Sequence, residues 1–307
     1  MKHFTMHGKL YEDQNINGWM ASEKLDGCRG LWLPNFPSEY SNDPDTEPTG
    51  LWSRDGKVIH APKWWLQHLP KDIPLDGELY LDRKSFQLTM SVVRKKRPIV
   101  NEWQYIKFMV FDMPVLMESG GIRFKNNTVE IPKINLHPKI TYQPPFKFVY
   151  KILQRDVQEN DICKILPQYV IENKAALLSL LEEIISKGGE GVMVRDPFSC
   201  WEQNRSNKLL KVKPVHTMEV EVTGYYYGEG KFYGMMGSLE VKDKNNRIFK
   251  VSGFTDEQRK IKSVGIPFTR SKYDDCYFPI GSKITIKYRE LTDGGLPKEA
   301  RYESDRR

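Results

Sequence analysis

Apolar residues recur along the chain with two different periods, which predict a mixture of helices and strands. Residues 175–185 carry apolar side chains at the helical period, and glycines at 188 and 189 predict the end of that helix. Shorter helices are predicted over 61–69, where a proline stands near the start, and over 85–93. Apolar runs predict strands over residues 18–22, 31–33, 75–81, 105–112, 191–195 and 209–213.

The pattern changes at Pro214. Beyond it the chain shows short β patterns over residues 219–227, 237–241, 248–253 and 283–288, separated by turn sequences. Short strands at this spacing predict a small barrel, either an OB-fold or an SH3-like barrel. We therefore expect two domains, residues 1–213 of mixed α+β structure and residues 214–307 of all-β structure. The polar, proline-rich stretch 34–49 is predicted to be an exposed loop, and residues 120–150 give no clear pattern.

Composition and charge indicate the class of protein, its location and the kind of partner it binds. Apolar residues make up 39% of the chain and charged residues 28%, as in soluble globular proteins. We find neither an apolar run of roughly 20 residues nor a secretory signal, so no membrane span and a cytoplasmic location are expected. The 4 cysteines lie far apart and form no metal-binding pair. The net charge of +7 favours a polyanionic partner such as nucleic acid, although charge alone is weak support.

The most specific local pattern is Lys24-x-Asp26-Gly27-x-Arg29, in a turn between two predicted strands. A lysine held there can act as a nucleophile, because a neighbouring cation such as Arg29 favours the neutral amine. Asp26 could orient that amine, and Gly27 would let the backbone approach a phosphate closely. A charged β-turn with Asp-Gly at its tip is the simpler alternative.

Two carboxylate pairs and two alternating lysines suggest where a nucleotide and its metal would lie. Asp76-Gly-Glu78 and Glu190-Gly191 each place a carboxylate at the start of a strand, which suits Mg²⁺, although solvated acidic turns look the same. Lys211 and Lys213 fall on one face of a strand by period two, and an anion between them would relieve their repulsion. A solvated edge strand is the alternative.

The order of these motifs decides between the alternatives. Lys-x-Asp-Gly-x-Arg, Asp-Gly-Glu, a strand ending in Phe111-Asp112, Glu-Gly-Val-Met193 and Lys-x-Lys follow one another in the chain. This series resembles the covalent nucleotidyltransferase superfamily, and most closely its minimal ATP-dependent DNA ligases. The resemblance implies an α+β nucleotidyltransferase domain with ATP-grasp-like antiparallel sheets and helices, followed by an all-β OB-fold domain.

The resemblance also assigns roles to single residues. Lys24 would carry AMP from ATP, with Asp26, Lys211 and Lys213 as its catalytic partners. Glu78 and Glu190 would organise Mg²⁺, with Mn²⁺ as an alternative. Nucleotide binding would involve the residues Ser22, Glu23, Arg29, Glu78, Phe111, Met193, Lys211 and Lys213, with Phe111 and Met193 on either side of the adenine. Without the resemblance, Phe111 could equally be a core aromatic residue.

The implied substrate is nicked duplex DNA, bound by a monomer. Contacts to DNA or to the nick phosphate are expected from Arg54, Arg205 and the basic residues Arg94, Lys95 and Lys96. The segment 254–279 is long enough to add DNA contacts. The aromatic residues at 225–227, 232 and 233 could also meet DNA, but packing in the barrel is the prediction that we favour for them. The C-terminal end departs from the family pattern, and Lys298 or Arg301 would take the pyrophosphate-binding role there. An RNA ligase, a capping-type guanylyltransferase and a non-catalytic nucleic-acid-binding barrel are the alternatives.

Overall fold

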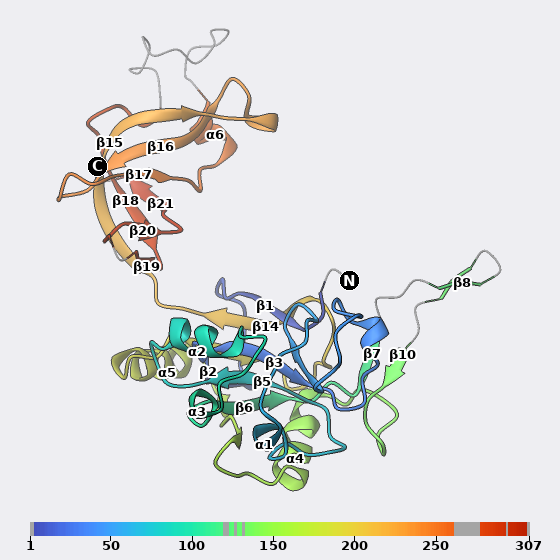
Figure 1. Ribbon diagram of the computed structural model, residues 1–307. Coiled ribbons are helices and arrows are strands. Elements are labelled where there is room, and N and C mark those ends of the chain that lie inside the picture. The colour runs from blue at the N-terminus through green and yellow to red at the C-terminus, as the bar shows by residue number, and fades with distance from the viewer. Residues whose placement is uncertain are drawn as a thin grey trace. The chain divides into compact units, whose positions relative to one another are not determined.

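A computed structural model describes residues 3–118, 123–125, 128–130, 133–260, 277–292 and 294–305 (Figure 1). The chain divides into two compact units, Met1–Lys213 and Pro214–Arg307, which are described separately below. Much of the segment 254–279, which was expected to add DNA contacts, lies outside the described residues. None of the described helices is long and apolar enough to span a bilayer.

The first unit contains two five-stranded sheets, which for clarity are called sheets A and B. Both are antiparallel except at one edge, where β1 pairs with β14 and β11 pairs with β6 in parallel. Sheet A has the order β1 (His7–Leu10), β14 (Arg205–Val212), β13 (Val192–Arg195), β2 (Trp19–Glu23) and β12 (Tyr169–Ile171). Sheet B has the order β11 (Cys163–Ile165), β6 (Lys107–Asp112), β5 (Leu75–Tyr80), β3 (Cys28–Trp32) and β4 (Leu51–Ser53).

The helix predicted over 175–185 is confirmed as α5 (Lys174–Ser186). Its N-terminus is capped by Asn173, whose side chain accepts a hydrogen bond from the backbone N–H of Ala176. Leu177, Leu181 and Ile184 form its buried stripe and pack against the strands of sheet A. The predicted helices at 61–69 and 85–93 are confirmed as the shorter α1 (Lys63–Leu66) and as α2 (Phe86–Val93).

The segment without a clear pattern contains elements that we did not predict. They are β8 (Arg123–Lys125), β9 (Thr128–Glu130), β10 (Lys133–Asn135) and the start of α4 (Phe146–Asp156), while α3 (Val100–Trp103) and β7 (Leu116–Glu118) were missed elsewhere. Phe146, Val149 and Leu153 form the buried stripe of α4, which contacts β6 of sheet B. This spacing after Pro145 is a helical signal, but the surrounding prolines and lysines obscured it.

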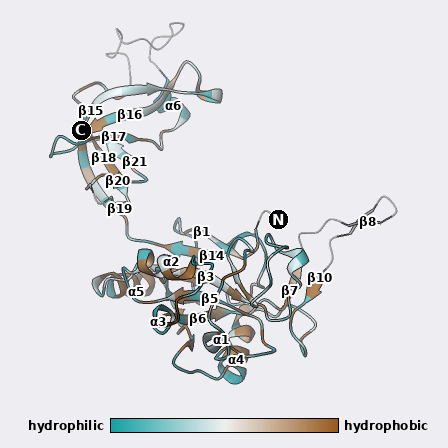
Figure 2. Ribbon diagram, viewed as in Figure 1, coloured by the Kyte–Doolittle hydropathy of each residue, from teal (hydrophilic) through white to brown (hydrophobic). Residues whose placement is uncertain are grey.

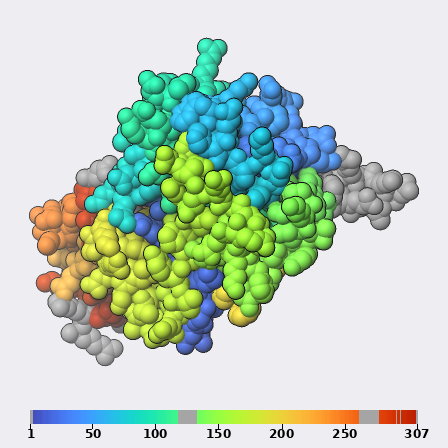
Figure 3. All heavy atoms as spheres, turned by 90° about the horizontal axis from the view of Figure 1, so that it is seen from below, coloured from blue at the N-terminus to red at the C-terminus, as the bar shows by residue number. Residues whose placement is uncertain are grey.

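The described residues form four apolar clusters, three in the first unit and one in the second. Hydrophobic residues gather along the strands and the inward faces of the helices, as Figure 2 shows. Seen from below, side chains of the N-terminal part, in blue to cyan, and of the segment around α4, in yellow-green, lie side by side on the surface of the first unit (Figure 3). The two sheets and their helices therefore form one continuous scaffold for the loops between them.

The second unit is built on one five-stranded antiparallel sheet. Its order is β17 (Ile248–Val251), β16 (Met236–Lys242), β15 (His216–Tyr227), β18 (Lys283–Tyr288) and β21 (Arg301–Asp305). The short pair β19 (Glu290–Leu291) and β20 (Pro297–Lys298) and the helix α6 (Asp256–Arg259) complete it. Four of these strands correspond to the four predicted β patterns, and inward side chains such as Val222, Leu239 and Ile286 form the core.

Candidate active site

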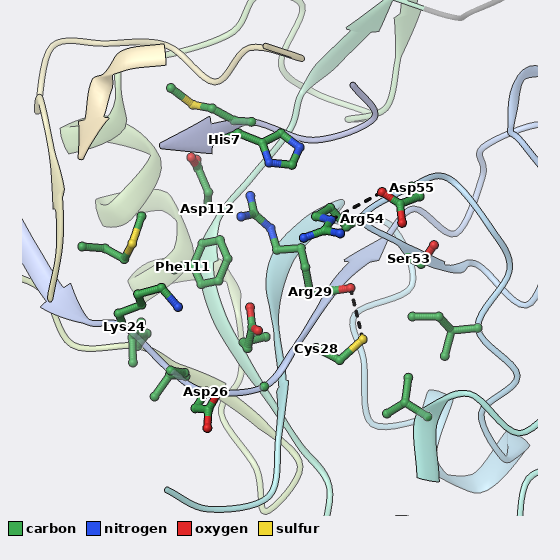
Figure 4. Close-up of a pocket in the computed structure, with 18 of the residues that line it drawn as sticks. His7, Lys24, Asp26, Cys28, Arg29, Ser53, Arg54, Asp55, Phe111 and Asp112 are labelled. Carbon is green, nitrogen blue, oxygen red and sulfur yellow. Dashed lines mark hydrogen bonds and ion pairs between the residues drawn. The ribbon is translucent and has the colours of Figure 1, made fainter. Parts of the chain in front are cut away.

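A cavity of about 940 Å³ is lined by residues of both sheets of the first unit. Figure 4 shows Lys24, Arg29 and Phe111 grouped in it, with Asp26 on the same turn as Lys24. The turn matters because it connects β2 of sheet A with β3 of sheet B, so its residues lie where the two sheets meet. The sequence pattern around Lys24 is therefore located in a cavity large enough for a nucleotide.

Local packing fixes the turn that carries Lys24. The backbone N–H of Lys24 donates a 2.8 Å hydrogen bond to the carbonyl of Gly191. A Cβ at Gly27 would lie 2.4 Å from the carbonyl oxygen of Leu79, so only glycine lets the turn pack this tightly on β5. The observed reason for a glycine at this position is thus close approach to a strand, where we had expected close approach to a phosphate.

Glu190 joins the two lysines that the sequence separates by almost two hundred residues. One carboxylate oxygen of Glu190 is paired with the ammonium group of Lys24, and the other lies 2.7 Å from the ammonium nitrogen of Lys213. All three side chains are about one-fifth exposed. The carboxylate therefore holds both cations and neutralises part of their charge, although Lys213, unlike Lys24 and Glu190, is not among the residues that line the cavity.

Sheet register aligns a second group of the predicted residues. Met193 on β13 is paired with Ser22 on β2 on one side and with Lys211 on β14 on the other. Residues that are opposite one another in neighbouring strands share a face, so these three side chains form one row on the cavity wall. Burial and the neighbouring cations Lys24 and Arg205 lower the pKa of Lys211, which marks a concentration of positive charge at this wall.

The opposite wall is formed by sheet B. Arg29 on β3 and Glu78 on β5 are register partners, and both line the cavity. Burial raises the pKa of Glu78 to about 7, with smaller contributions from Asp76 and Glu190, although Arg29 and Lys24 act in the opposite direction. A carboxylate in this setting would gain from a further cation beside it.

Arg29 is held by a buried carboxylate and lies on an aromatic ring. Its guanidinium donates two hydrogen bonds of 2.5 and 2.6 Å to Asp76, which is fully buried. The indole N–H of Trp201 donates a third hydrogen bond of 2.8 Å to the same carboxylate. The guanidinium carbon lies 4.6 Å from the centre of the half-buried Phe111 ring. Asp76 and Trp201 thus fix the orientation of Arg29 and support Phe111 at the cavity wall.

Two of the predicted residues have other partners. The carboxylate of Glu23 forms two 2.8 Å hydrogen bonds with Arg83, a pairing that nothing in the sequence pattern indicated. Lys95 lies 2.6 Å from the carboxylate of Glu102 and is not among the residues that line the cavity, whereas its neighbours Arg94 and Lys96 are. The basic run 94–97 is therefore divided between the cavity and an ion pair on the surface.

A second cavity of about 320 Å³ adjoins the first and shares four of its lining residues. Those shared are His7, Arg54, Asp55 and Lys211, and the remaining lining residues are His3, Phe4, Asn42 and Arg205. Arg54 and Arg205, which we predicted to hold a phosphate, therefore line one small basic chamber. Burial and nearby cations lower the pKa of His7 to about 4, with Arg29 the largest of those charges.

Comparison with known proteins identifies the family of this arrangement. The family model described as "ATP dependent DNA ligase domain" matches residues 14–213, and "DNA ligase OB-like domain" matches residues 227–306. The chain belongs to the ATP-dependent DNA ligase family. The predicted fold class, a nucleotidyltransferase domain followed by an OB-fold, is thereby confirmed, and the RNA ligase and capping alternatives are not favoured.

Some relatives of this ligase match nearly all of its chain, and others match a smaller part. The DNA ligase of Haemophilus influenzae is 28% identical over 95% of this chain and 88% of its own. A solved Lig E DNA ligase, studied for DNA binding with a minimal scaffold, is 28% identical, covers 98% of both chains and gives a TM-score of 0.63. The DNA ligase of Archaeoglobus fulgidus is 31% identical, but only over 37% of this chain and 22% of its own.

Several residues of the cavities were missed by the sequence analysis of this ligase. His7 lies on the N-terminal strand β1, and Asn42, Asp43 and Thr46 belong to the stretch that was predicted only as a loop. Trp201, which supports Asp76, belongs to no motif that we recognised. None of these residues stands at a characteristic spacing from the others, so only the folded chain brings them together.

Proposed function

We propose that this ligase seals nicks in duplex DNA through AMP carried on Lys24. The observation that supports this most directly is the position of the Lys24 amine, which lies in the cavity against Glu190 and next to Lys213. In the first step the Nζ atom of Lys24 would form a bond to the α-phosphorus of ATP, and the bond to pyrophosphate would break. Phosphoryl transfer of this kind needs positioned cations more than further covalent chemistry.

The residues around Lys24 suit the parts of that reaction. The two lysines Lys211 and Lys213 would offset the charge that develops on the α-phosphate, and Lys213 already lies 2.7 Å from Glu190. Phe111 and Met193 come from opposite walls of the cavity and would enclose the adenine ring, as in stacking on an aromatic face. Asp26, on the turn of Lys24, would orient the amine.

The carboxylates fit a divalent cation. Glu78 and Glu190 both line the cavity, and burial, with a smaller contribution from Glu190, raises the pKa of Glu78 to about 7. Mg²⁺ binds proteins through one or two carboxylates and completes its shell with water and substrate phosphates. When bound, the ion would neutralise the charge of the triphosphate. Glu190, freed from its pairing with Lys24, would leave that amine available as the nucleophile.

The second cavity would receive the 5′-phosphate of the nick. Its two arginines, Arg54 and Arg205, are exposed, and Lys211 on the shared wall connects it with the nucleotide cavity. A phosphate there would lie beside AMP on Lys24, where AMP can pass to it. The exposed basic residues Arg94 and Lys96 would add contacts to the DNA backbone.

A sealing assay tests the proposal. The wild-type protein, ATP and Mg²⁺ are incubated with a nicked duplex that carries a labelled 5′-phosphate, and the joined strand is separated on a denaturing gel. We expect joining by the wild type, none by Lys24→Ala, and a large loss for Arg54→Ala with adenylation retained. Duplexes with RNA on either side of the nick form the second arm. Joining only of RNA-containing nicks would contradict the proposed substrate.

A further inference from the structure

The loop between β15 and β16 carries the most exposed large hydrophobic side chain of the second unit's described part. Tyr233 is 87% exposed, and Lys231, two residues earlier, is exposed as well. The sequence analysis predicted that aromatic residues of this segment pack in the barrel, and for Tyr233 that prediction was wrong. Its neighbour Phe232 is partly buried instead.

The loop is ordered by its own hydrogen bonds. Backbone N–H groups of Gly228, Phe232, Tyr233 and Met235 donate to carbonyls within the loop at 2.9 to 3.1 Å. The chain folds back on itself so closely that a Cβ on Gly228 would lie 2.3 Å from the carbonyl oxygen of Phe232. Tyr233 therefore stands on a fixed turn, and its exposure is a property of the folded loop.

A buried arginine clamps the base of the loop. Arg259 of α6 is 7% exposed and donates hydrogen bonds to the carbonyls of Met236, at 2.8 Å, and Gly237. Its guanidinium carbon lies 4.2 Å from the centre of the Phe232 ring. Burying a cation is unfavourable unless it is paired, and here the compensating contacts are made to the loop. Arg259 thus connects the start of β16 with Phe232 of the loop and fixes the loop at its base.

An exposed aromatic ring on such a turn contributes nothing to the core. It gains apolar burial only when a partner covers it. The exposed Lys231, whose ammonium nitrogen lies 4.5 Å from the centre of the neighbouring Phe232 ring, suits a partner that also presents anions. The sugar–phosphate backbone of DNA offers both, an apolar deoxyribose face and a phosphate at neighbouring positions. The positive net charge of the chain agrees with such a partner.

We propose that the loop 228–235 is a DNA-contact element, in which Tyr233 packs on a deoxyribose or base of the duplex and Lys231 contacts an adjacent phosphate. The proposal rests on the proposed function, because it assumes that nicked duplex DNA is the substrate. It assigns the loop to DNA binding and gives it no part in the attack of Lys24 on ATP. Arg259 is a positioning residue that acts through the loop.

Binding of a fluorescent nicked duplex, measured by anisotropy at fixed salt, tests the proposal. We expect Tyr233→Ala to raise the Kd about tenfold, which is the typical effect of losing one aromatic contact to a nucleotide, and Tyr233→Phe to remain within about twofold of wild type. Lys231→Ala should lower the slope of log K against log salt by about one unit. Formation of the enzyme–AMP adduct without DNA should stay at the wild-type rate in all three variants.

Tyr142→Ala is the matched control, since Tyr142 is a tyrosine of the first unit that is 64% exposed. It should bind nicked DNA as the wild type does. Wild-type affinity of Tyr233→Ala would overturn the proposal, and so would a loss of adduct formation as large as the loss of binding. Failure of the wild type to seal nicks would instead overturn the proposed function. Far-UV circular dichroism checks that each variant is folded.

Discussion

Replacing Trp201 with phenylalanine tests how much the buried network under the cavity contributes to stability. Trp201 is 4% exposed, and its indole N–H donates a 2.8 Å hydrogen bond to the buried carboxylate of Asp76. Phenylalanine keeps most of the ring but removes that donor. A hydrogen bond to a charged group is worth about 1.5–3 kcal/mol. The free energy of unfolding should therefore fall by this amount beyond the cost of replacing the indole with a smaller ring. The reason is that, among the hydrogen bonds of the described residues, the carboxylate then keeps those with Arg29.

Trp52 provides a matched control in the same apolar cluster. It is 0% exposed, and its indole N–H has no hydrogen-bond partner in the described part of the chain. Trp52→Phe therefore removes similar ring area without removing a hydrogen bond, and it even deletes an unsatisfied donor. We expect Trp201→Phe to lower the free energy of unfolding by at least about 1.5 kcal/mol more than Trp52→Phe.

Urea denaturation followed by far-UV circular dichroism measures the difference. The comparison requires that the free energy of unfolding depends on urea concentration with the same slope in both variants. A shift of the urea midpoint then reports a change in stability alone. Equal losses for Trp201→Phe and Trp52→Phe would refute the reasoning, since they would mean that the bond to Asp76 adds nothing. A smaller loss for Trp201→Phe would refute it more strongly.

Three further predictions concern the cavity. The pKa of Glu78 is raised to about 7, so the folded state holds its proton more tightly, and the stability that this provides is lost as the pH rises from about 4.5 through 7. The free energy of unfolding of Glu78→Gln, relative to that of the wild type, should therefore rise by up to roughly 3 kcal/mol between pH 4.5 and pH 8, as measured by urea denaturation. A difference between the two proteins that does not change with pH would contradict this. Phe111→Leu should raise the KM for ATP in adduct formation by about two- to tenfold, because an aromatic contact to the adenine is lost, and an unchanged KM would exclude that contact. Arg94→Ala should lower the salt dependence of DNA binding by about one unit of slope whereas Lys95→Ala, which only breaks the pair with Glu102, should not, and equal effects would count against the division of the basic run.

The sequence predicted what is encoded locally or over long periodic segments. The helix α5 has three buried residues at helical spacings of four and three, and the residues around Lys24 form a compact pattern, so both could be recognised without the fold. The helix α4 was missed because prolines and charged residues surround its three buried positions. Its stripe is short, and such a stripe is ambiguous until a sheet is available to cover it.

Contacts between distant segments could not be predicted. Glu190 was expected near a metal, but its bridging of Lys24 and Lys213 depends on the pairing of β13 with β2 and β14. The pairing of Glu23 with Arg83 likewise joins two segments that share no motif. Such contacts are set by sheet register and loop packing, which a single sequence does not specify.

The location of the bound AMP tests the central claim most directly. The wild-type protein is incubated with ATP and Mg²⁺, digested, and analysed by mass spectrometry of its peptides. We predict one adduct, an AMP on the peptide that contains Lys24, which is stable to base, labile to acid as a phosphoramidate, and lost in Lys24→Ala. An AMP found on another lysine, such as Lys211 or Lys213, with the Lys24 peptide unmodified, would contradict the account.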